Sequence, residues 1–271
     1  MSDGWQELIP TQALRAKLSR GEPCLGAWLS IGDPLTVETW ASDCTLDWVL
    51  IDMEHSGQGW QGLQMMFLGW KGCATPLIVR VPSQDLSFIS RAMDLGAAGI
   101  VVPFVNTAEQ AARIVSACKY PPVGTRGFGP RRASRHYARS AEYRDSANDG
   151  LFVVVQIEHR QGLENVEEIA SVPGLDGLFI GPGDLSFSLG VPQQYTHPDL
   201  LAAIRRIIQV GKAKGLPLSM AIDDRPEIIA NWIREGIAMP TIGLDGLVLR
   251  EAFKQAAMAV RNLASDSKTQ A

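Results

Sequence analysis

The chain has 271 residues, enough for one large domain and marginal for two, and 46% of them are hydrophobic and 20% charged. This ordinary globular balance argues against a disordered or fibrous protein. The formal net charge of −4 argues against nucleic acid and against an anionic membrane surface as partners.

The chain also lacks the usual marks of export or membrane insertion. No apolar stretch approaches the ~20 residues that cross a bilayer. The start at Met1 has neither the charged region nor the apolar core of a signal peptide. The four cysteines lie near apolar segments without metal-binding spacing, so we expect buried free thiols and, from these, a cytoplasmic location. They are Cys24, Cys44, Cys73 and Cys118.

After a helical pattern over Thr11–Arg20, short apolar runs alternate with longer helical patterns. The runs are rich in Val, Ile and Leu without clear alternation, which is typical of strands buried on both faces. The patterns between them carry apolar residues at helical spacing. In chain order the predicted elements are strand Cys24–Ser30, helix Leu35–Ala41, strand Trp48–Asp52, helix Gln61–Cys73, strand Leu77–Val81, helix Leu86–Asp94, strand Gly99–Val102, helix Ala108–Cys118, strand Phe152–Glu158, helix Leu163–Ser171, strand Gly177–Ile180, helix Pro198–Lys214, strand Leu216–Ile222, helix Pro226–Glu235, strand Met239–Gly243 and helix Leu247–Leu263.

Eight strands alternating with eight helices predict a (β/α)8 barrel with an extra N-terminal helix, as one domain over residues 1–271 with its core at about 22–264. The alternative is an open doubly wound sheet. That fold typically has a Gly-rich phosphate loop after its first strand, and Leu29–Pro34 is not one. The longest stretch without periodicity is Pro121–Gly150, which we interpret as a functional or flexible loop.

In a barrel, chemistry collects where the strands end at the C-terminal face. Here the second, third, fifth and sixth strands end in polar residues, and burying so many ionisable groups is costly unless they pair or bind a metal. These strand ends are Asp52-Met-Glu-His55, Arg80, Gln156-Ile-Glu158 and Gly181-Pro-Gly-Asp184.

Glu158 and Asp184 are candidate ligands for a hard cation, because Mg²⁺ and Mn²⁺ take one or two carboxylates and leave room for water and substrate. Two carboxylates alone could equally be buried ion-pair partners. The glycine-rich turn before Asp184 favours the metal site, because its backbone can approach a small anion. Gln156 is expected on the same side of its strand as Glu158, where it could orient the substrate.

Arg80 would supply a forked cation for a carboxylate or an oxyanion; the alternative is a salt bridge to Asp52 or Glu54. His55 is the natural general base near neutral pH, and the alternative is a core histidine satisfied by Asp52. Both interpretations of His55 can hold, since a catalytic histidine needs an orienting acid.

The lysines argue against a Schiff-base aldolase, which needs a desolvated lysine in the barrel mouth. All seven are predicted in helices, at helix ends or in the tail, so an enolate here would need a metal. They are Lys17, Lys71, Lys119, Lys212, Lys214, Lys254 and Lys268.

The chain resembles the metal-dependent (class II) pyruvate aldolases of the 4-hydroxy-2-oxoheptanedioate and 2-dehydro-3-deoxyglucarate aldolase family, in the aldolase/citrate lyase superfamily. The similarity runs from about Gly26 to Gly246, with its motifs in family order. The motifs are Ile51-Asp-Met-Glu-His55, Val79-Arg80, Tyr120-Pro-Pro-Val-Gly-Thr-Arg-Gly127, Val155-Gln-Ile-Glu158 and Phe179-Ile-Gly-Pro-Gly-Asp-Leu-Ser186.

The resemblance implies a role for each matching residue. Glu158 and Asp184 would hold Mg²⁺ or Mn²⁺, with Co²⁺ also compatible, and the backbone at Gly183 and Asp184 would cradle the pyruvate carboxylate. Arg80 would polarise the keto oxygen, and His55, assisted by Asp52, would be the base.

The resemblance also implies an assembly. Asp94 would reach a neighbouring subunit's site, and a hexamer would form as a trimer of dimers that exchange a C-terminal helix. The implied substrates are a 2-oxo acid, pyruvate or oxaloacetate, and an aldehyde. Alternatives on the same scaffold are oxaloacetate decarboxylation and a citrate-synthase-like or secondary-metabolite reaction that forms a C–C bond. From another class, a non-catalytic oxo-acid-binding protein would not require the base.

Three features have weaker interpretations. The basic segment Arg131–Arg139 would be a substrate lid, a subunit contact or a solvated loop. The Gly-x-Asp at Gly243 could form a phosphate corner. Residues Leu218–Ile222 and the Pro121–Gly150 loop should contact the aldehyde part of the substrate.

Overall fold

The computed structural model describes residues 8–42, 45–221 and 225–269, with side chains up to residue 264. The predicted thiol Cys44 and the predicted strand end Ile222 lie outside the described residues. Of the other three cysteines, Cys24 and Cys118 are buried free thiols, and Cys73 is half-buried rather than buried.

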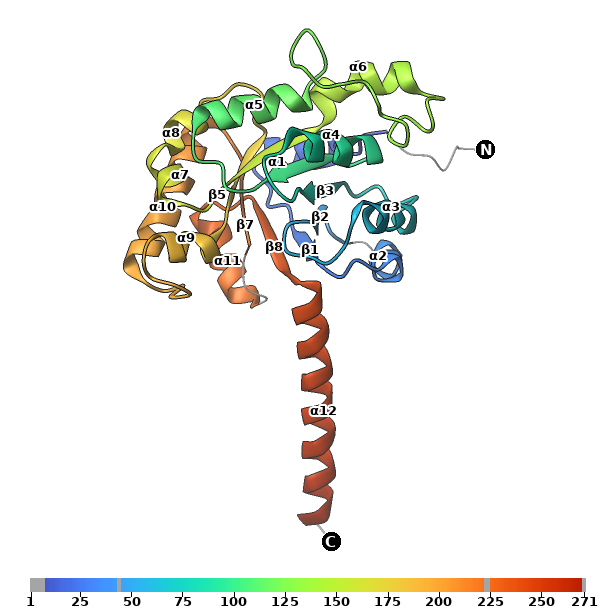
Figure 1. Cartoon of the computed structure of the whole chain (residues 1–271). Coiled ribbons are helices and arrows are strands. Elements are labelled where there is room, and N and C mark those ends of the chain that lie inside the picture. Colours follow the sequence, from blue (N-terminus) through green and yellow to red (C-terminus); the bar gives the residue numbers. More distant parts are fainter. Residues whose placement is uncertain (1–7, 43–44, 222–224, 270–271) are drawn as a thin grey trace.

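Parallel strands close into a barrel in the order β1 to β8, with helices around it (Figure 1). This confirms the predicted (β/α)8 fold. Each strand pairs with the next along the chain, and β8 pairs with β1 to close the ring. The strands are β1 Gly26–Leu29, β2 Trp48–Asp52, β3 Leu77–Arg80, β4 Gly99–Val102, β5 Phe152–Ile157, β6 Gly177–Ile180, β7 Leu218–Met220 and β8 Met239–Leu244.

The helices follow the predicted order, and α1 is the extra N-terminal helix. It covers the N-terminal end of the barrel, where Leu14 packs into the interior cluster and Arg15 donates to the carbonyl of Leu151 at 3.0 Å. The helices are α1 Gln12–Ser19, α2 Pro34–Ala41, α3 Trp60–Gly69, α4 Leu86–Leu95, α5 Ala108–Cys118, α6 Ser140–Gly150, α7 Arg160–Glu164, α8 Val166–Ile169, α9 Pro182–Ser188, α10 Pro198–Lys214, α11 Pro226–Glu235 and α12 Asp245–Thr269.

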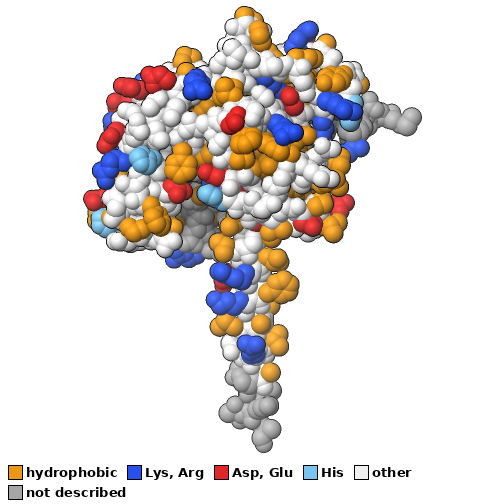
Figure 2. All heavy atoms as spheres, in the orientation of Figure 1, with side chains coloured by type: hydrophobic (Ala, Val, Ile, Leu, Met, Phe, Trp, Pro, Cys, Tyr) orange, Lys and Arg blue, Asp and Glu red, His pale blue; other side chains and the backbone are white. Residues whose placement is uncertain are grey.

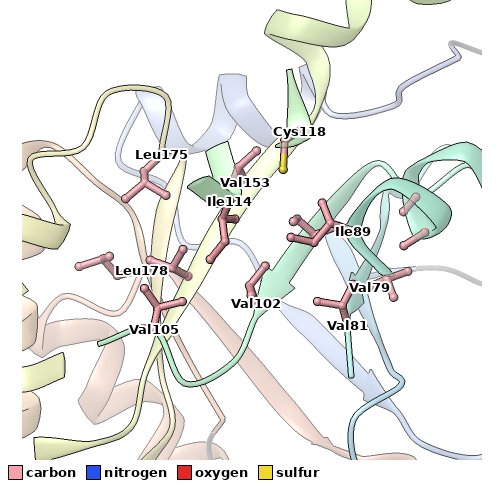
Figure 3. Close-up of a cluster of buried hydrophobic side chains, with 14 of the residues drawn as sticks. Val79, Val81, Ile89, Val102, Val105, Ile114, Cys118, Val153, Leu175 and Leu178 are labelled. Carbon is pink, nitrogen blue, oxygen red and sulfur yellow. The ribbon is translucent and has the colours of Figure 1, made fainter. Parts of the chain in front are cut away.

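The strands sort their side chains into two apolar layers. Residues facing outward pack against the helices, and Figure 3 shows part of this layer, where Ile89 of α4 and Ile114 of α5 gather with Val102 and Val153. Residues at the alternate positions form a second cluster inside the barrel. This alternation decides which residues reach the C-terminal rim.

The Pro121–Gly150 stretch is more ordered than a loop, because it contains α6. Only Tyr143 and Ala147 of α6 are buried, so the helix lacks the apolar stripe that would have revealed it. Two short helices also differ from the prediction. The predicted helix Leu163–Ser171 is divided at Asn165 into α7 and α8, and α9 was not predicted.

The last helix, α12, leaves the barrel and projects away from it (Figure 1). Its described side chains are mostly exposed, and Figure 2 shows hydrophobic groups along it. The exchange of this helix between subunits stays a prediction. Within the described ranges no helix is both long and apolar enough to cross a membrane.

Candidate active site

Strand alternation carries four polar residues to the top of the barrel interior. Trp48 and Leu50 of β2 belong to the interior cluster, so Asp52, two residues further, points the same way. By the same parity Ile78 leads to Arg80. On β5, Phe152 and Val154 lead to Gln156 and Glu158. All four are buried, so the predicted strand-end cluster is assembled.

Arg80 and Asp52 form a buried forked ion pair. Arg80 Nε donates to Asp52 Oδ1 at 3.0 Å and Nη2 donates to Oδ2 at 2.8 Å. The Trp28 Nε1–H also approaches Oδ2, at 3.3 Å, and the guanidinium lies 4.5 Å from the Trp28 ring centroid. Burial alone would raise the pKa of Asp52, but the hydrogen bonds and charge of Arg80 outweigh burial and lower it. The salt bridge to Asp52, which is the alternative interpretation of Arg80, is therefore present. It fixes the position of the Arg80 guanidinium at the rim.

Glu54, rather than Asp52, is the acid beside the His55 imidazole. Glu54 Oε2 lies 2.8 Å from Arg80 Nη1 and 3.9 Å from His55 Nε2. Asp52 approaches His55 only at the backbone N–H, at 3.4 Å. The His55 side chain is 61% exposed, so its interpretation as a core histidine is wrong. The Asp52 carboxylate binds Arg80 and backbone N–H groups. It can therefore affect His55 only through the backbone of the loop.

Glu158 is a carboxylate held by neutral donors. Its Oε1 accepts the backbone N–H of Phe104 at 2.7 Å, and its Oε2 accepts from Gln156 Nε2 at 2.5 Å. Burial raises the pKa of Glu158 to about 7; the Phe104 hydrogen bond opposes this shift, and the charges of Glu54 and Asp184 add to it. This carboxylate therefore lies among like charges in a dry environment.

Gly181 permits this arrangement. A Cβ on Gly181 would lie 2.6 Å from Glu158 Oε2 and 2.7 Å from Gln156 Nε2, so only glycine fits. The sequence predicts an anion-binding role for the glycines of this turn. The sequence signal for the packing role is that Gly181 follows the interior residue Phe179 by two positions.

Asp184 and Gly183 lie in the first turn of α9, after β6. The first backbone N–H groups of a helix have no partner within the helix, so both can donate to a ligand. A Cβ on Gly183 would meet no atom within 4 Å, so the space beside it is open. The Asp184 charge raises the pKa of both Glu54 and Glu158, which places it on their side of the rim.

Asp94 lies elsewhere, at the C-terminal end of α4 on the outside of the barrel. It pairs with the buried Arg126 at 2.8 Å. It also lines a cavity of about 730 Å³ together with Arg91, Arg131 and His136. The structure does not bring Asp94 to the rim of its own barrel.

Two arginines in the segment between α5 and α6 are internal supports. Arg126 is buried, and Arg132 donates to the backbone carbonyls of Leu95 and Phe67 at 2.7 and 2.9 Å. These arginines hold the segment against the barrel, which distinguishes them from the exposed Arg131.

The rim fits a divalent cation. Its donors are carboxylate and amide oxygens, and Gln156 Oε1 is buried without a hydrogen-bond partner in the described part of the chain. The Asp184 charge raises the pKa of Glu54 and of Glu158, and the Glu54 charge adds to the shift of Glu158. A bound cation would relieve this repulsion. Among the residues described, no three His, Cys, Asp or Glu side chains converge as metal ligands.

Two residues of the site were not predicted. Trp28 supports both members of the Arg80–Asp52 pair. Phe104 holds Glu158 from a left-handed backbone conformation, φ 54°, which is costly for a non-glycine residue. No sequence pattern marks either role, because each depends on contacts between different strands.

The comparisons with known proteins agree with this geometry. A family model described as HpcH/HpaI aldolase/citrate lyase matches residues 25–252. The chain belongs to the HpcH/HpaI aldolase/citrate lyase family. Membership makes it a lyase, as the resemblance implied.

Its relatives in this family are similar over nearly their whole length. A 4-hydroxy-2-oxovalerate aldolase of Rhodococcus jostii is 37% identical over 93% of this chain and 96% of its own. A 2-dehydro-3,6-dideoxy-6-sulfogluconate aldolase of Pseudomonas putida is 36% identical over 90% of this chain and 95% of its own. The crystal structure of a family protein from Burkholderia cenocepacia superposes with a TM-score of 0.87, at 32% identity, over 93% of this chain and 100% of the other.

Proposed function

We propose that this family member is a divalent-metal-dependent aldolase that cleaves or forms 4-hydroxy-2-oxo acids through a pyruvate enolate. The observation that carries the proposal is one arginine, fixed by Asp52, beside the carboxylates Glu158 and Asp184. The named activities of the Rhodococcus and Pseudomonas relatives support an oxo-acid aldolase.

Glu158 and Asp184 would hold Mg²⁺ or Mn²⁺. Bound there, the ion would supply positive charge that stabilises the enolate oxygen. The backbone N–H groups of Gly183 and Asp184 would bind the substrate carboxylate, and Gln156 Oε1 is free to orient the bound molecule.

Arg80 and His55 would perform the remaining steps. Arg80 uses Nε and one N–H of Nη2 for Asp52, and its Nη1 lies 2.8 Å from Glu54. One N–H on each of Nη1 and Nη2 is left for the keto oxygen. His55 removes the proton of the 4-hydroxyl group, and Glu54 stabilises the resulting imidazolium at 3.9 Å. The C3–C4 bond then breaks, its electron pair forms the pyruvate enolate, and the new carbonyl leaves as the aldehyde.

The test is proton–deuterium exchange at the methyl group of pyruvate, which reports enolate formation without knowledge of the aldehyde. We expect exchange with Mn²⁺ or Mg²⁺, its loss with a chelator, and its loss in Glu158→Gln. An absence of exchange with every divalent metal would contradict the aldolase and favour an oxo-acid-binding protein.

We further propose that the chain works as a homo-oligomer in which α12 docks on a second copy, in a hexamer built from dimers. Exposed apolar side chains on α12, such as Phe253 and Leu263, support this proposal. So does an apolar groove of about 560 Å³ between α11 and the base of the chain's own α12, lined by Ile229, Ile233 and Val248. In the same assembly Asp94 would reach a neighbour's site. Sedimentation of the full chain tests the assembly, and a monomer at micromolar concentration would contradict it.

A further inference from the structure

A bulge in the last strand aims one buried acid at the loop after the first strand. Gly26 pairs with Thr241 but Trp28 pairs with Leu244, so β8 has one residue more than β1 between these pairs. Gly243 lies within this stretch in the left-handed region, at φ 95°. Bulges re-aim the side chains that follow them and are frequent beside active sites. The residue that follows is Asp245.

Asp245 is 3% exposed, and its carboxylate binds the loop between β1 and α2. Oδ1 accepts from the Ser30 hydroxyl at 2.8 Å, and Oδ2 accepts from the Ile31 N–H at 2.9 Å. Both oxygens also lie 3.1 Å from Ser30 N. Hydrogen bonds to a charged acceptor are the stronger kind. Asp245, at the end of β8, therefore ties down the loop that follows β1, and the phosphate corner near Gly243 stays a prediction.

The loop that Asp245 holds packs on the next loop along the rim. A Cβ on Gly32 would lie 2.7 Å from Cβ of Gln58, so the two loops are in close contact there. Gln58 Nε2 in turn donates to the backbone carbonyl of Asp52 at 2.7 Å. Glu54 and His55 lie between these two points in the chain.

We propose that Asp245 is a positioning residue of the active site, acting through the β1–α2 loop and Gln58 on the backbone that carries His55. The proposal rests on the proposed function, which assigns proton transfer to His55. The His55 side chain is exposed, so its place depends on the loop backbone rather than on packing. Asp245, at the start of α12, thus fixes the position of His55 in the loop after β2.

The test compares Asp245→Asn with Asp176→Asn, a half-buried carboxylate at the opposite end of the barrel that accepts from Arg15 and from the Val153 N–H. The asparagine keeps the shape but sets an NH2 group against the backbone donors. We expect kcat to fall at least tenfold in Asp245→Asn, with Mn²⁺ affinity within twofold of wild type. Asp176→Asn should keep kcat within twofold.

A second readout does not depend on catalysis. Amide hydrogen exchange should accelerate at residues 30–33 and 53–59 in Asp245→Asn and not in Asp176→Asn. If the wild type shows no metal-dependent pyruvate exchange, the proposed function fails, and the hydrogen-exchange pattern still decides the positioning role. Unchanged kcat in Asp245→Asn, or unchanged exchange at residues 53–59, would overturn the proposal.

Gln58→Ala provides an independent variant if Asp245→Asn does not fold. It breaks the second contact without altering the buried carboxylate. We expect kcat to fall severalfold with unchanged Mn²⁺ affinity, and a kcat equal to wild type would overturn the proposal.

Discussion

The two ends of the barrel differ in how the charge of their carboxylates is balanced. At the N-terminal end, Asp47 precedes β2 and Asp176 precedes β6, and each pairs with a cation of α1. Lys17 lies 2.5 Å from Asp47, and Arg15 lies 2.6 Å from Asp176. Each carboxylate also accepts one backbone N–H, so charge is cancelled locally.

At the C-terminal end, four carboxylates lie near one arginine, which pairs with only two of them. Asp52 and Glu54 both contact Arg80, whereas neither Glu158 nor Asp184 has an ion-pair partner among the described residues. The charges at the N-terminal end therefore stabilise the fold, whereas the C-terminal end keeps excess negative charge. The proposed metal would bind at the C-terminal end.

Removing the Arg80 side chain at the C-terminal end of the barrel should have the largest effect on turnover. We expect Arg80→Ala to lower kcat on the order of 10²–10³-fold, because the enolate loses a fixed donor. Mn²⁺ binding should survive, as Arg80 is not a ligand. Steady-state turnover and a Mn²⁺ titration measure the two quantities, with Arg80→Lys as the control that keeps charge but loses the fork. Full activity in Arg80→Ala would contradict its role.

Glu158 should make the metal-free protein less stable as pH rises. Its folded pKa, about 7, lies above the ordinary 4.5, so the stabilising proton is fully bound below pH 4.5 and lost as pH rises through 7. The loss is about 3 kcal/mol at most. We expect Glu158→Gln to remove this dependence, as measured by urea unfolding between pH 5 and 8 with chelator. Equal pH slopes in the two proteins would refute the shift.

At the N-terminal end the expected effect is on stability alone. Arg15→Ala removes a partly exposed pair with Asp176 and a hydrogen bond to the carbonyl of Leu151, and should cost about 1 kcal/mol of unfolding free energy. We expect kcat to stay within twofold. A large loss of turnover without loss of stability would break the distinction between the two ends.

The smallest effect concerns the thiols. Burial raises the pKa of Cys24 to about 11 and that of Cys118 to about 12. At pH 8 the thiolate fraction is then on the order of 0.1% or less. We expect iodoacetamide to spare both in the native protein and to modify both in urea, by mass spectrometry. Rapid native labelling of Cys118 would show that the fold opens there.

Much of the rim could be predicted because strand alternation has a fixed period. Two-residue steps from apolar interior positions lead to Asp52, Arg80 and Glu158 without knowledge of the helices. The same reasoning placed Gln156 beside Glu158, which the hydrogen bond between them confirms.

What could not be predicted depends on contacts between loops. Glu54, rather than Asp52, lies near the His55 imidazole because of the turn after β2. The spacing of these residues in the sequence does not reveal this. The bulge that aims Asp245 follows from the closure of β8 on β1. Whether Asp94 serves another subunit depends on assembly, which one chain does not encode in its periodicity.

The most direct test of the metal site is a Mn²⁺ titration followed by electron paramagnetic resonance, with wild type, Glu158→Gln and Asp176→Asn in parallel. We predict one Mn²⁺ bound per chain in wild type and in Asp176→Asn, and at least a tenfold weaker affinity in Glu158→Gln. Equal affinity in all three proteins, or no binding in wild type, would contradict a metal at the C-terminal rim.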